Sequence, residues 1–201
     1  HLDAGVARVL ATLRETGQEN NTLVLFSSDN GGQLEMGANN GPTRGGKQSM
    51  YEGGLRVPFA ARWPGRIKPG SQSERVALTM DIFPTVLDAV GVKLNHHIEG
   101  LTLLPALLGE NQPPYQRDLF FTRREGGNQY GGKTIDAVIR GDWKLLQNLP
   151  WEPLQLYNLK NDPLEQNDQA GKQRKVFNEL STALRQQIQR GGAVPWQPPG
   201  R

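Results

Sequence analysis

An Asp-Asn pair follows a run of apolar residues and could bind a metal ion. Asp29 and Asn30 come directly after residues 22–28, which are typical of a buried strand. Asn-Gly is also a strong hairpin signal, but residues 31–54 are too polar and glycine-rich to supply the second strand. Open α/β sheets bind ligands beyond the carboxyl ends of their strands, and carboxylate and amide oxygens suit Ca²⁺ or Mg²⁺. Two protein ligands are too few for either metal, so spacing alone leaves both the turn and the metal site open.

A lysine in the following loop could bind an anion. Lys47 comes after Gly45 and Gly46, which permit close approach of a ligand, and its ammonium group suits phosphate or sulfate. The loop is not a Walker motif, because the Gly-x₄-Gly-Lys-Ser/Thr pattern is absent. A solvated surface lysine is the alternative interpretation. Glu52 and Arg56, later in the same loop, are predicted to form a structural pair that holds the turn between them.

Two arginines and two histidines are further candidates. Arg123 and Arg124 open a second glycine-rich stretch and could grip an anionic substrate, although a solvated hairpin tip explains them as well. His96 and His97 are adjacent, and neighbouring side chains rarely point the same way. We therefore expect the two histidines to lie on a loop surface and not in a metal site.

The elements that must position these residues form an α/β pattern in the first part of the chain. The spacing of apolar residues predicts helices at 2–16, 81–91 and 101–108, and strands at 22–28 and 56–63. The strand at 22–28 is continuously apolar, which favours a parallel strand buried on both faces. This pattern predicts that residues 1–112 are part of an α/β domain with a mixed sheet flanked by helices.

The pattern changes after a linker at residues 109–114. Short strands are predicted at 118–122, 137–140, 143–147 and 155–157, followed by an amphipathic helix at 176–188. Gly141-Asp142 is the clearest turn and predicts an antiparallel pair. Residues 113–201 are therefore predicted to form a small α+β subdomain with an antiparallel sheet and a closing helix.

Composition limits the classes of function. The chain has 201 residues, no Cys and a formal net charge of +3 from scattered charges. The absence of Cys excludes disulfides, Cys-ligated zinc, iron–sulfur clusters and an encoded thiol nucleophile within this sequence. No stretch is long and apolar enough for a membrane span, and no basic face is evident that would bind nucleic acid.

Several motifs together resemble the second half of the type I, formylglycine-dependent sulfatases of the alkaline phosphatase superfamily. They occur in the expected order and spacing along essentially the whole chain, at residues 27–31, 46–47, 51–58, 81–87, 141–145 and 156–163. The Tyr-Glu-Gly-Gly-Leu-Arg-Val-Pro segment at 51–58 also favours this branch over phosphatases of the same superfamily.

The resemblance implies a site and a reaction. Asp29 and Asn30 would supply two ligands to a divalent cation, usually Ca²⁺ with Mg²⁺ as the alternative, and Lys47 would bind the sulfate group and act catalytically. Arg124 is a hypothetical contact at the rim of the substrate site. The implied activity is hydrolysis of an aryl or carbohydrate sulfate ester, and sulfatases of this type are often exported.

The resemblance also implies that parts of the site are absent. We expect the chain to lack the family's nucleophile, a formylglycine made from Cys or Ser in a Cys/Ser-x-Pro/Ala-x-Arg motif. The sequence opens on a helix at His1-Leu2 without a cap, so we interpret it as a C-terminal portion, inactive without an N-terminal half that carries formylglycine. A non-catalytic anion- or cation-binding remnant, or a phosphatase or phosphodiesterase relative, remains the alternative.

Overall fold

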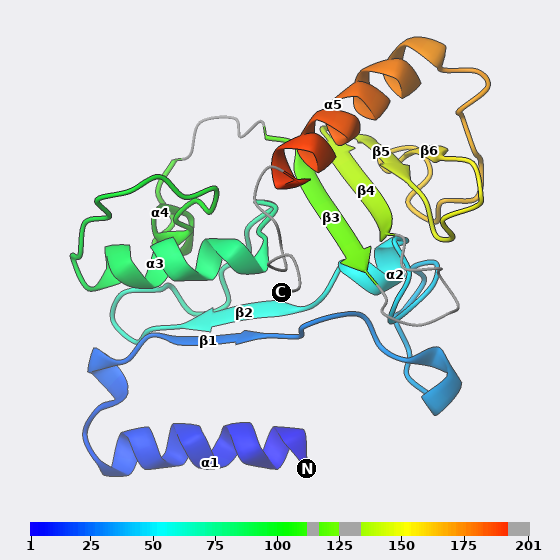
Figure 1. The fold of residues 1–201 in the computed structure, drawn as a ribbon. Helices are drawn as coiled ribbons and strands as arrows, with labels where there is room; N and C mark the ends of the chain where they lie inside the picture. Colours follow the sequence, from blue (N-terminus) through cyan, green and yellow to red (C-terminus); the bar gives the residue numbers. More distant parts are fainter. Residues whose placement is uncertain (112–116, 125–133, 193–201) are drawn as a thin grey trace, which may run out of the picture. The chain divides into compact units, whose positions relative to one another are not determined.

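The computed structural model describes residues 1–111, 117–124 and 134–192 (Figure 1). The chain divides into two compact units, each built from two separate stretches of sequence. The first unit contains residues 1–29 and 58–115, and the second contains residues 30–57 and 116–201. The predicted domain boundary after residue 112 stays a prediction. The structure adds that the loop between the first two strands packs with the C-terminal part of the chain.

The first unit contains the helices and strands that the α/β pattern predicts. In chain order these are α1 (Leu2–Glu15), β1 (Val24–Ser27), β2 (Phe59–Arg62), α3 (Ile82–Ala89) and α4 (Leu104–Leu107). Short 3₁₀ turns at Glu19–Asn21 and Thr79–Asp81 precede β1 and α3. All five elements lie within the residue ranges expected from apolar spacing.

The pairing of β1 corrects one expectation. β1 pairs with β2 in antiparallel register, from Val24 opposite Arg62 to Ser27 opposite Phe59. The strand is also only half-buried, and Phe26 is 37% exposed. The prediction of a parallel strand buried on both faces is therefore wrong for this pair. A continuous apolar run does not encode strand direction, and here the intervening loop returns the chain so that β2 runs back along β1.

The second unit is built on a four-stranded antiparallel sheet in the order β3-β4-β5-β6. The strands are β3 (Leu119–Arg124), β4 (Thr134–Arg140), β5 (Trp143–Leu146) and β6 (Gln155–Asn158). As predicted, β4 and β5 are joined by a tight turn at Gly141 and Asp142, and Gly141 adopts φ 56°. The antiparallel C-terminal sheet is confirmed.

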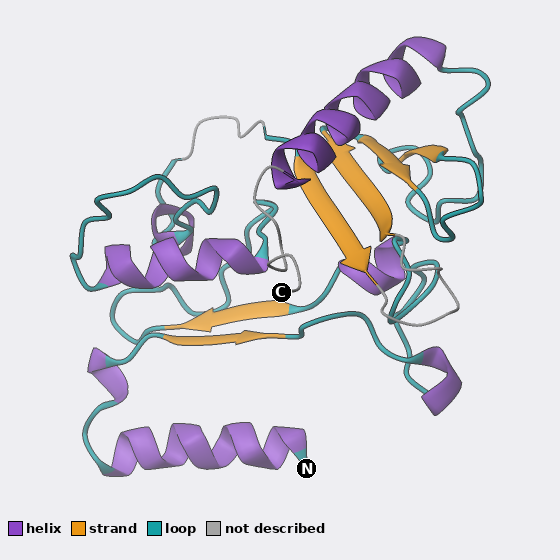
Figure 2. Cartoon of the chain, viewed as in Figure 1, coloured by secondary structure: helices purple, strands orange, loops and turns teal. Residues whose placement is uncertain are grey.

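The two faces of this sheet carry different partners (Figure 2). The helix α5 (Arg174–Gly192) covers one face, with a core of Val138, Leu145, Leu156, Leu180 and Leu184. The loop 30–57, which includes α2 (Glu52–Leu55), packs on the other face around Met50, Ile135, Ala137, Leu146 and Tyr157. Side chains alternate between the faces of each strand, so one sheet supports both the closing helix and the loop that contains Lys47.

Membrane-spanning helices are not found among the described residues, since none is both long and apolar enough.

Candidate functional site

The loop 30–57 is held together by backbone hydrogen bonds between its two ends. Gly31 N donates to Gly54 O at 2.9 Å, and Gly53 N donates to Arg44 O at 2.8 Å. Lys47 N donates to Gly32 O at 3.0 Å. The segment that follows Asn30 therefore lies beside the segment that contains Lys47.

Asn40 joins these segments from within the loop. Its Oδ1 accepts a hydrogen bond from Gly32 N at 2.7 Å, and its Nδ2 donates to Gly32 O at 3.2 Å and Gly45 O at 3.1 Å. One half-buried amide thus takes the place of strand pairing in a segment whose one regular element is a 3₁₀ turn at Leu34–Met36.

Glycine permits the close packing of this loop. A Cβ on Gly31 would lie 1.7 Å from Gly53 O, and a Cβ on Gly53 would lie 2.2 Å from Gly45 O. The obstructing atoms are backbone atoms, which cannot rotate away. At Gly31 and Gly53, glycine is therefore required because backbone packs directly on backbone.

The predicted metal ligands lie at the point where the chain passes from the first unit to the second. Asp29 is exposed, and Asn30 is half-buried with its Nδ2 donating to Gly31 O at 2.8 Å. This bond orients the Asn30 amide. Asp29 and Asn30 offer oxygen donors of the kind that Ca²⁺ prefers, which fits the predicted cation in chemistry. They do not complete a site, because the described ranges contain no group of three or more His, Cys, Asp or Glu placed to hold a metal.

The predicted anion-binding residue, Lys47, has an exposed side chain and a fixed backbone. Directly after it, Gln48 adopts φ 81°, a left-handed conformation that non-glycine residues rarely adopt. The carbonyl of Gln48 accepts a hydrogen bond from Arg123 Nη1 at 2.6 Å. The corner next to Lys47 is thus held by an arginine of β3.

Arg123 and Arg124 point to opposite faces of the sheet. Arg123 lies on the face of Phe121, which packs against the loop, and Arg124 lies on the face of Phe120, which packs toward α5. Sequence reasoning favoured Arg124 as the substrate contact, whereas the arginine that touches the Lys47 corner is Arg123. Strand alternation is the signal that separates them. The glycine-rich stretch after Arg124 lies outside the described residues.

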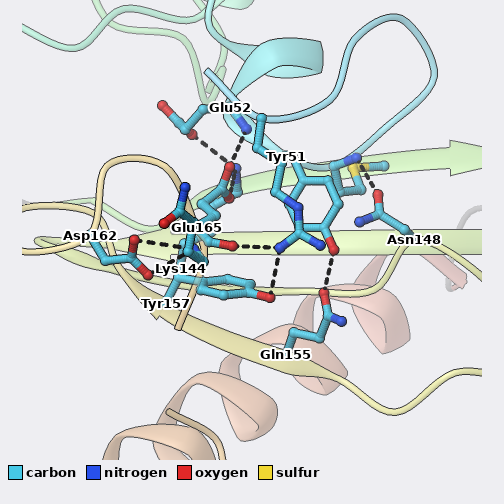
Figure 3. Close-up of polar contacts among 11 residues, drawn as sticks. Tyr51, Glu52, Lys144, Asn148, Gln155, Tyr157, Asp162 and Glu165 are labelled. Carbon is cyan, nitrogen blue, oxygen red and sulfur yellow. Dashed lines mark hydrogen bonds and ion pairs between the residues drawn. The ribbon is translucent and has the colours of Figure 1, made fainter. Parts of the chain in front are cut away.

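A buried ion cluster anchors the loop to the sheet (Figure 3). We call Glu52, Lys144 and Glu165 the anchor cluster. Lys144 Nζ lies 2.9 Å from Glu52 Oε1 and 2.9 Å from Glu165 Oε1, and Glu165 Oε2 accepts a hydrogen bond from Glu52 N at 2.7 Å. Burial raises the pKa of Glu165, and the positive charge of Lys144 opposes that rise.

Arg44 provides a second anchor beside this cluster. Its guanidinium lies 3.9 Å from the centre of the Tyr51 ring, and its Nη1 donates to the Tyr157 hydroxyl at 3.2 Å and to the backbone oxygen of Glu165. Burial raises the pKa of Tyr157 to about 12, above the ordinary value of a tyrosine phenol. Tyr51 in turn donates to Gln155 Oε1 at 2.8 Å (Figure 3).

The anchor cluster corrects the expectation of a Glu52–Arg56 pair. Glu52 pairs with Lys144 on β5, and Arg56 forms no ion pair among the described residues. Sequence spacing suggested a local partner, but the actual partner is far along the chain. A lysine inside the apolar strand Trp143–Leu146 was the available signal, because a charge in a buried strand needs a counter-charge.

One segment of the chain matches the Cys/Ser-x-Pro/Ala-x-Arg pattern of the nucleophile motif. This corrects the expectation that the chain has no such match. Residues 181–185 read Ser-Thr-Ala-Leu-Arg. They lie within α5, where Ser181 is 6% exposed and neighbours Leu180 in the core. This face of the sheet is opposite the one that carries the Lys47 loop. The match in letters therefore does not place a nucleophile beside Lys47.

His96 and His97 are exposed in a loop of the first unit, where the Nδ1 atom of His96 lies 3.0 Å from Asn95 Oδ1.

Comparisons with known proteins identify the family. The family model named Sulfatase matches residues 1–92. Steryl-sulfatase of Rattus norvegicus is 43% identical over 129 residues, which are 59% of this chain and 22% of that protein. Arylsulfatase A of Homo sapiens is 32% identical over 209 residues, which cover 92% of this chain and 40% of that protein.

Solved structures agree with these relatives. The crystal structure of Ps i-CgsB in complex with k-i-k-neocarrahexaose matches 92% of this chain and 40% of its own, with 31% identity and a TM-score of 0.79. A protein solved in complex with its substrate D-glucosamine-2-N,6-O-disulfate matches 96% of this chain and 39% of its own, with 28% identity and a TM-score of 0.75. The chain thus spans less than half the length of these proteins. Its sequence matches and its α/β architecture together place it in the sulfatase family.

Proposed function

We propose that these residues serve the hydrolysis of sulfate esters, with Lys47 binding the sulfate group and Asp29 and Asn30 binding a divalent cation. The observation that carries the proposal is the hydrogen bond from Lys47 N to Gly32 O, two residues after Asn30. It keeps the predicted sulfate ligand and one predicted metal ligand within one packed loop. Family membership supports sulfate as the anion.

The chain's own residues would act electrostatically. Sulfate carries negative charge, and further charge develops on the leaving oxygen as the ester bond breaks. The exposed ammonium group of Lys47 would offset this charge, and the rigid loop would keep it in place before the reaction begins. A bound Ca²⁺, or Mg²⁺ in its place, would supply electrophilic polarisation of the sulfate oxygens.

The remaining parts of the reaction are proposed to lie in further polypeptide of the same protein. The chain spans 22% to 40% of the two curated relatives described above, so those relatives contain long segments with no counterpart here. We propose that formylglycine and the other metal ligands belong to such a segment, and that residues 1–201 alone are inactive.

Aryl and carbohydrate sulfates are the proposed substrate classes. One curated relative is an arylsulfatase, and one structural neighbour was solved with a disulfated glucosamine as its substrate. The carbohydrate class has the support of this neighbour, which matches 96% of the chain.

The direct test is turnover by the full-length protein that contains this sequence. We expect release of inorganic sulfate from p-nitrophenyl sulfate or from 6-O-sulfated amino sugars. p-Nitrophenyl phosphate serves as the control substrate. Turnover of the phosphate ester alone would favour a phosphatase, and binding of sulfate without turnover of any ester would favour a binding remnant.

Removal of the predicted metal ligands tests the cation. In the full-length enzyme, Asp29→Asn and Asn30→Ala are each expected to raise the Ca²⁺ concentration needed for half-maximal activity by about tenfold or more, because each removes an oxygen donor or its charge. Chelation with EGTA followed by Ca²⁺ titration measures this shift. The exposed Asp3 in α1 provides the control variant Asp3→Asn. An unchanged titration in both ligand variants would exclude these residues as ligands.

The two arginines of β3 provide a matched pair of variants. The rim-contact hypothesis predicts that Arg124→Ala changes the ratio of kcat/KM values between aryl and carbohydrate sulfates, although Arg124 lies on the face of the sheet opposite the Lys47 loop. Arg123→Ala is expected to lower kcat/KM for all esters by a similar factor, because it releases Gln48 O beside Lys47. Steady-state kinetics on several esters separates the two effects, and identical kinetics of Arg124→Ala and wild type would dismiss the rim contact.

A further inference from the structure

The loop that contains Lys47 is attached to the sheet on both sides of that lysine. Arg44 contacts Tyr157 and the backbone of Glu165 on one side, and Glu52 pairs with Lys144 on the other. Gly53 N donates to Arg44 O, which closes the segment between the two attachments. The backbone around Lys47 is therefore fixed at both ends by the same part of the sheet.

The anchor cluster is almost completely excluded from solvent. The side chains of Lys144 and Glu165 are both 0% exposed, and that of Glu52 is 12% exposed. A buried ammonium group is tolerated only when counter-charges surround it, so Lys144 depends on its two carboxylates as much as they depend on it. Arg44 adds a further attachment at the same place, because its guanidinium donates to the backbone oxygen of Glu165.

Two unusual backbone conformations indicate independently that the Lys47 loop and the anchor cluster are constrained. Among the described residues, Gln48 and Glu165 are the only non-glycine residues with positive φ, at 81° and 54°. Gln48 follows Lys47 directly, and Glu165 is a member of the anchor cluster. Such conformations persist only where surrounding contacts hold them. Here the contacts are Arg123 on Gln48 O and Lys144 on the Glu165 carboxylate.

We propose that Lys144 is a positioning residue for Lys47. It holds Glu52 and Glu165 together and thereby fixes the loop from which Lys47 presents its ammonium group. This inference rests on the proposed function in one respect only, namely that Lys47 binds the sulfate group. The attachment of the loop itself stands on the contacts of Lys144.

The test combines loop exchange with kinetics in the full-length protein. Lys144→Met keeps an unbranched side chain, one atom shorter, and removes its charge, and Glu52→Gln keeps a hydrogen-bond acceptor but weakens the pair. In both variants we expect faster backbone hydrogen exchange in peptides covering residues 44–57, with exchange in β4 and β5 close to wild type. We also expect kcat/KM for a sulfate ester to fall by about 100-fold in Lys144→Met, because a small displacement of a reacting group has that effect.

A second ion pair on the same sheet provides the matched control. Arg140 pairs with Asp118 through two contacts of 2.6 Å, on the face away from the loop. Arg140→Met therefore removes an ion pair of the sheet without touching the loop. We expect its loop exchange and its kcat/KM to match wild type.

Each result has a defined meaning. Unchanged exchange at residues 44–57, or unchanged kcat/KM, in a folded Lys144→Met protein would overturn the positioning role. Where Lys144→Met does not fold, Glu52→Gln decides by the same two measurements, and recovery of slow exchange in Lys144→Arg supports the role. A wild-type protein that turns over no sulfate ester would overturn the proposed function instead, while the exchange data would still report on the anchor.

Discussion

Lys47→Ala in the full-length protein is expected to reduce kcat/KM for sulfate esters by about 100- to 1,000-fold, the usual effect of removing one preorganised charge or donor from a transition state. The loop should keep its structure, because the Lys47 side chain is exposed and its backbone hydrogen bond to Gly32 O does not depend on the side chain. Steady-state kinetics together with a thermal melt measures both quantities.

Two further variants define what the result means. Lys47→Arg keeps the positive charge and is expected to recover part of the activity, although its planar group differs in shape from an ammonium. Lys68→Ala removes an exposed lysine of the first unit and should leave kcat/KM unchanged. A Lys47→Ala protein with wild-type kinetics would show that this lysine is an ordinary surface residue.

Gly31→Ala is expected to give the largest loss of stability of any single change in the loop. The new Cβ would lie 1.7 Å from Gly53 O and 2.7 Å from Gly53 C, which are backbone atoms of the facing segment. The loop would have to separate, and the bond from Gly31 N to Gly54 O would be lost with it. We expect the free energy of unfolding to fall by more than about 4 kcal/mol, measured by urea denaturation.

Gly171 provides the control for this substitution. It lies in the same unit, has no positive φ, and a Cβ there would meet nothing within 4 Å. Gly171→Ala is therefore expected to be neutral or slightly stabilising, by up to about 1 kcal/mol, through the unfolded state. Equal stabilities of the two variants would mean that the loop is not packed as described.

The sequence predicted the elements well where the pattern is local. The spacing of apolar residues gave α1, α3 and α5, and Gly141-Asp142 gave the β4–β5 hairpin. The spacing of apolar residues did not predict the direction of β1, because its pairing with β2 joins residues that the loop 30–57 separates in the sequence. A local pattern contains no information on a pairing that depends on where the chain returns.

The residue types of the candidate site could be predicted from the sequence, but the contacts that hold its loop to the sheet could not. Asp29, Asn30 and Lys47 stand out by type and spacing, and their roles remain predictions. Residue type and spacing did not identify the residues that hold the loop, because Glu52 and Lys144 are far apart in the sequence and form their ion pair only in the folded chain. A local rule paired Glu52 with Arg56, and the buried partner on β5 was missed.

The position of the loop in the second unit has a consequence for the order in which the protein is made. Asp29, Asn30 and Lys47 are synthesised before residue 58, yet the side chains that hold their loop, Lys144, Tyr157 and Glu165, emerge from the ribosome about a hundred residues later. The nascent chain therefore contains these candidate ligands well before it can fix their loop. A premature stop after β2 would leave all three residues encoded, but their loop without the sheet on which it is packed.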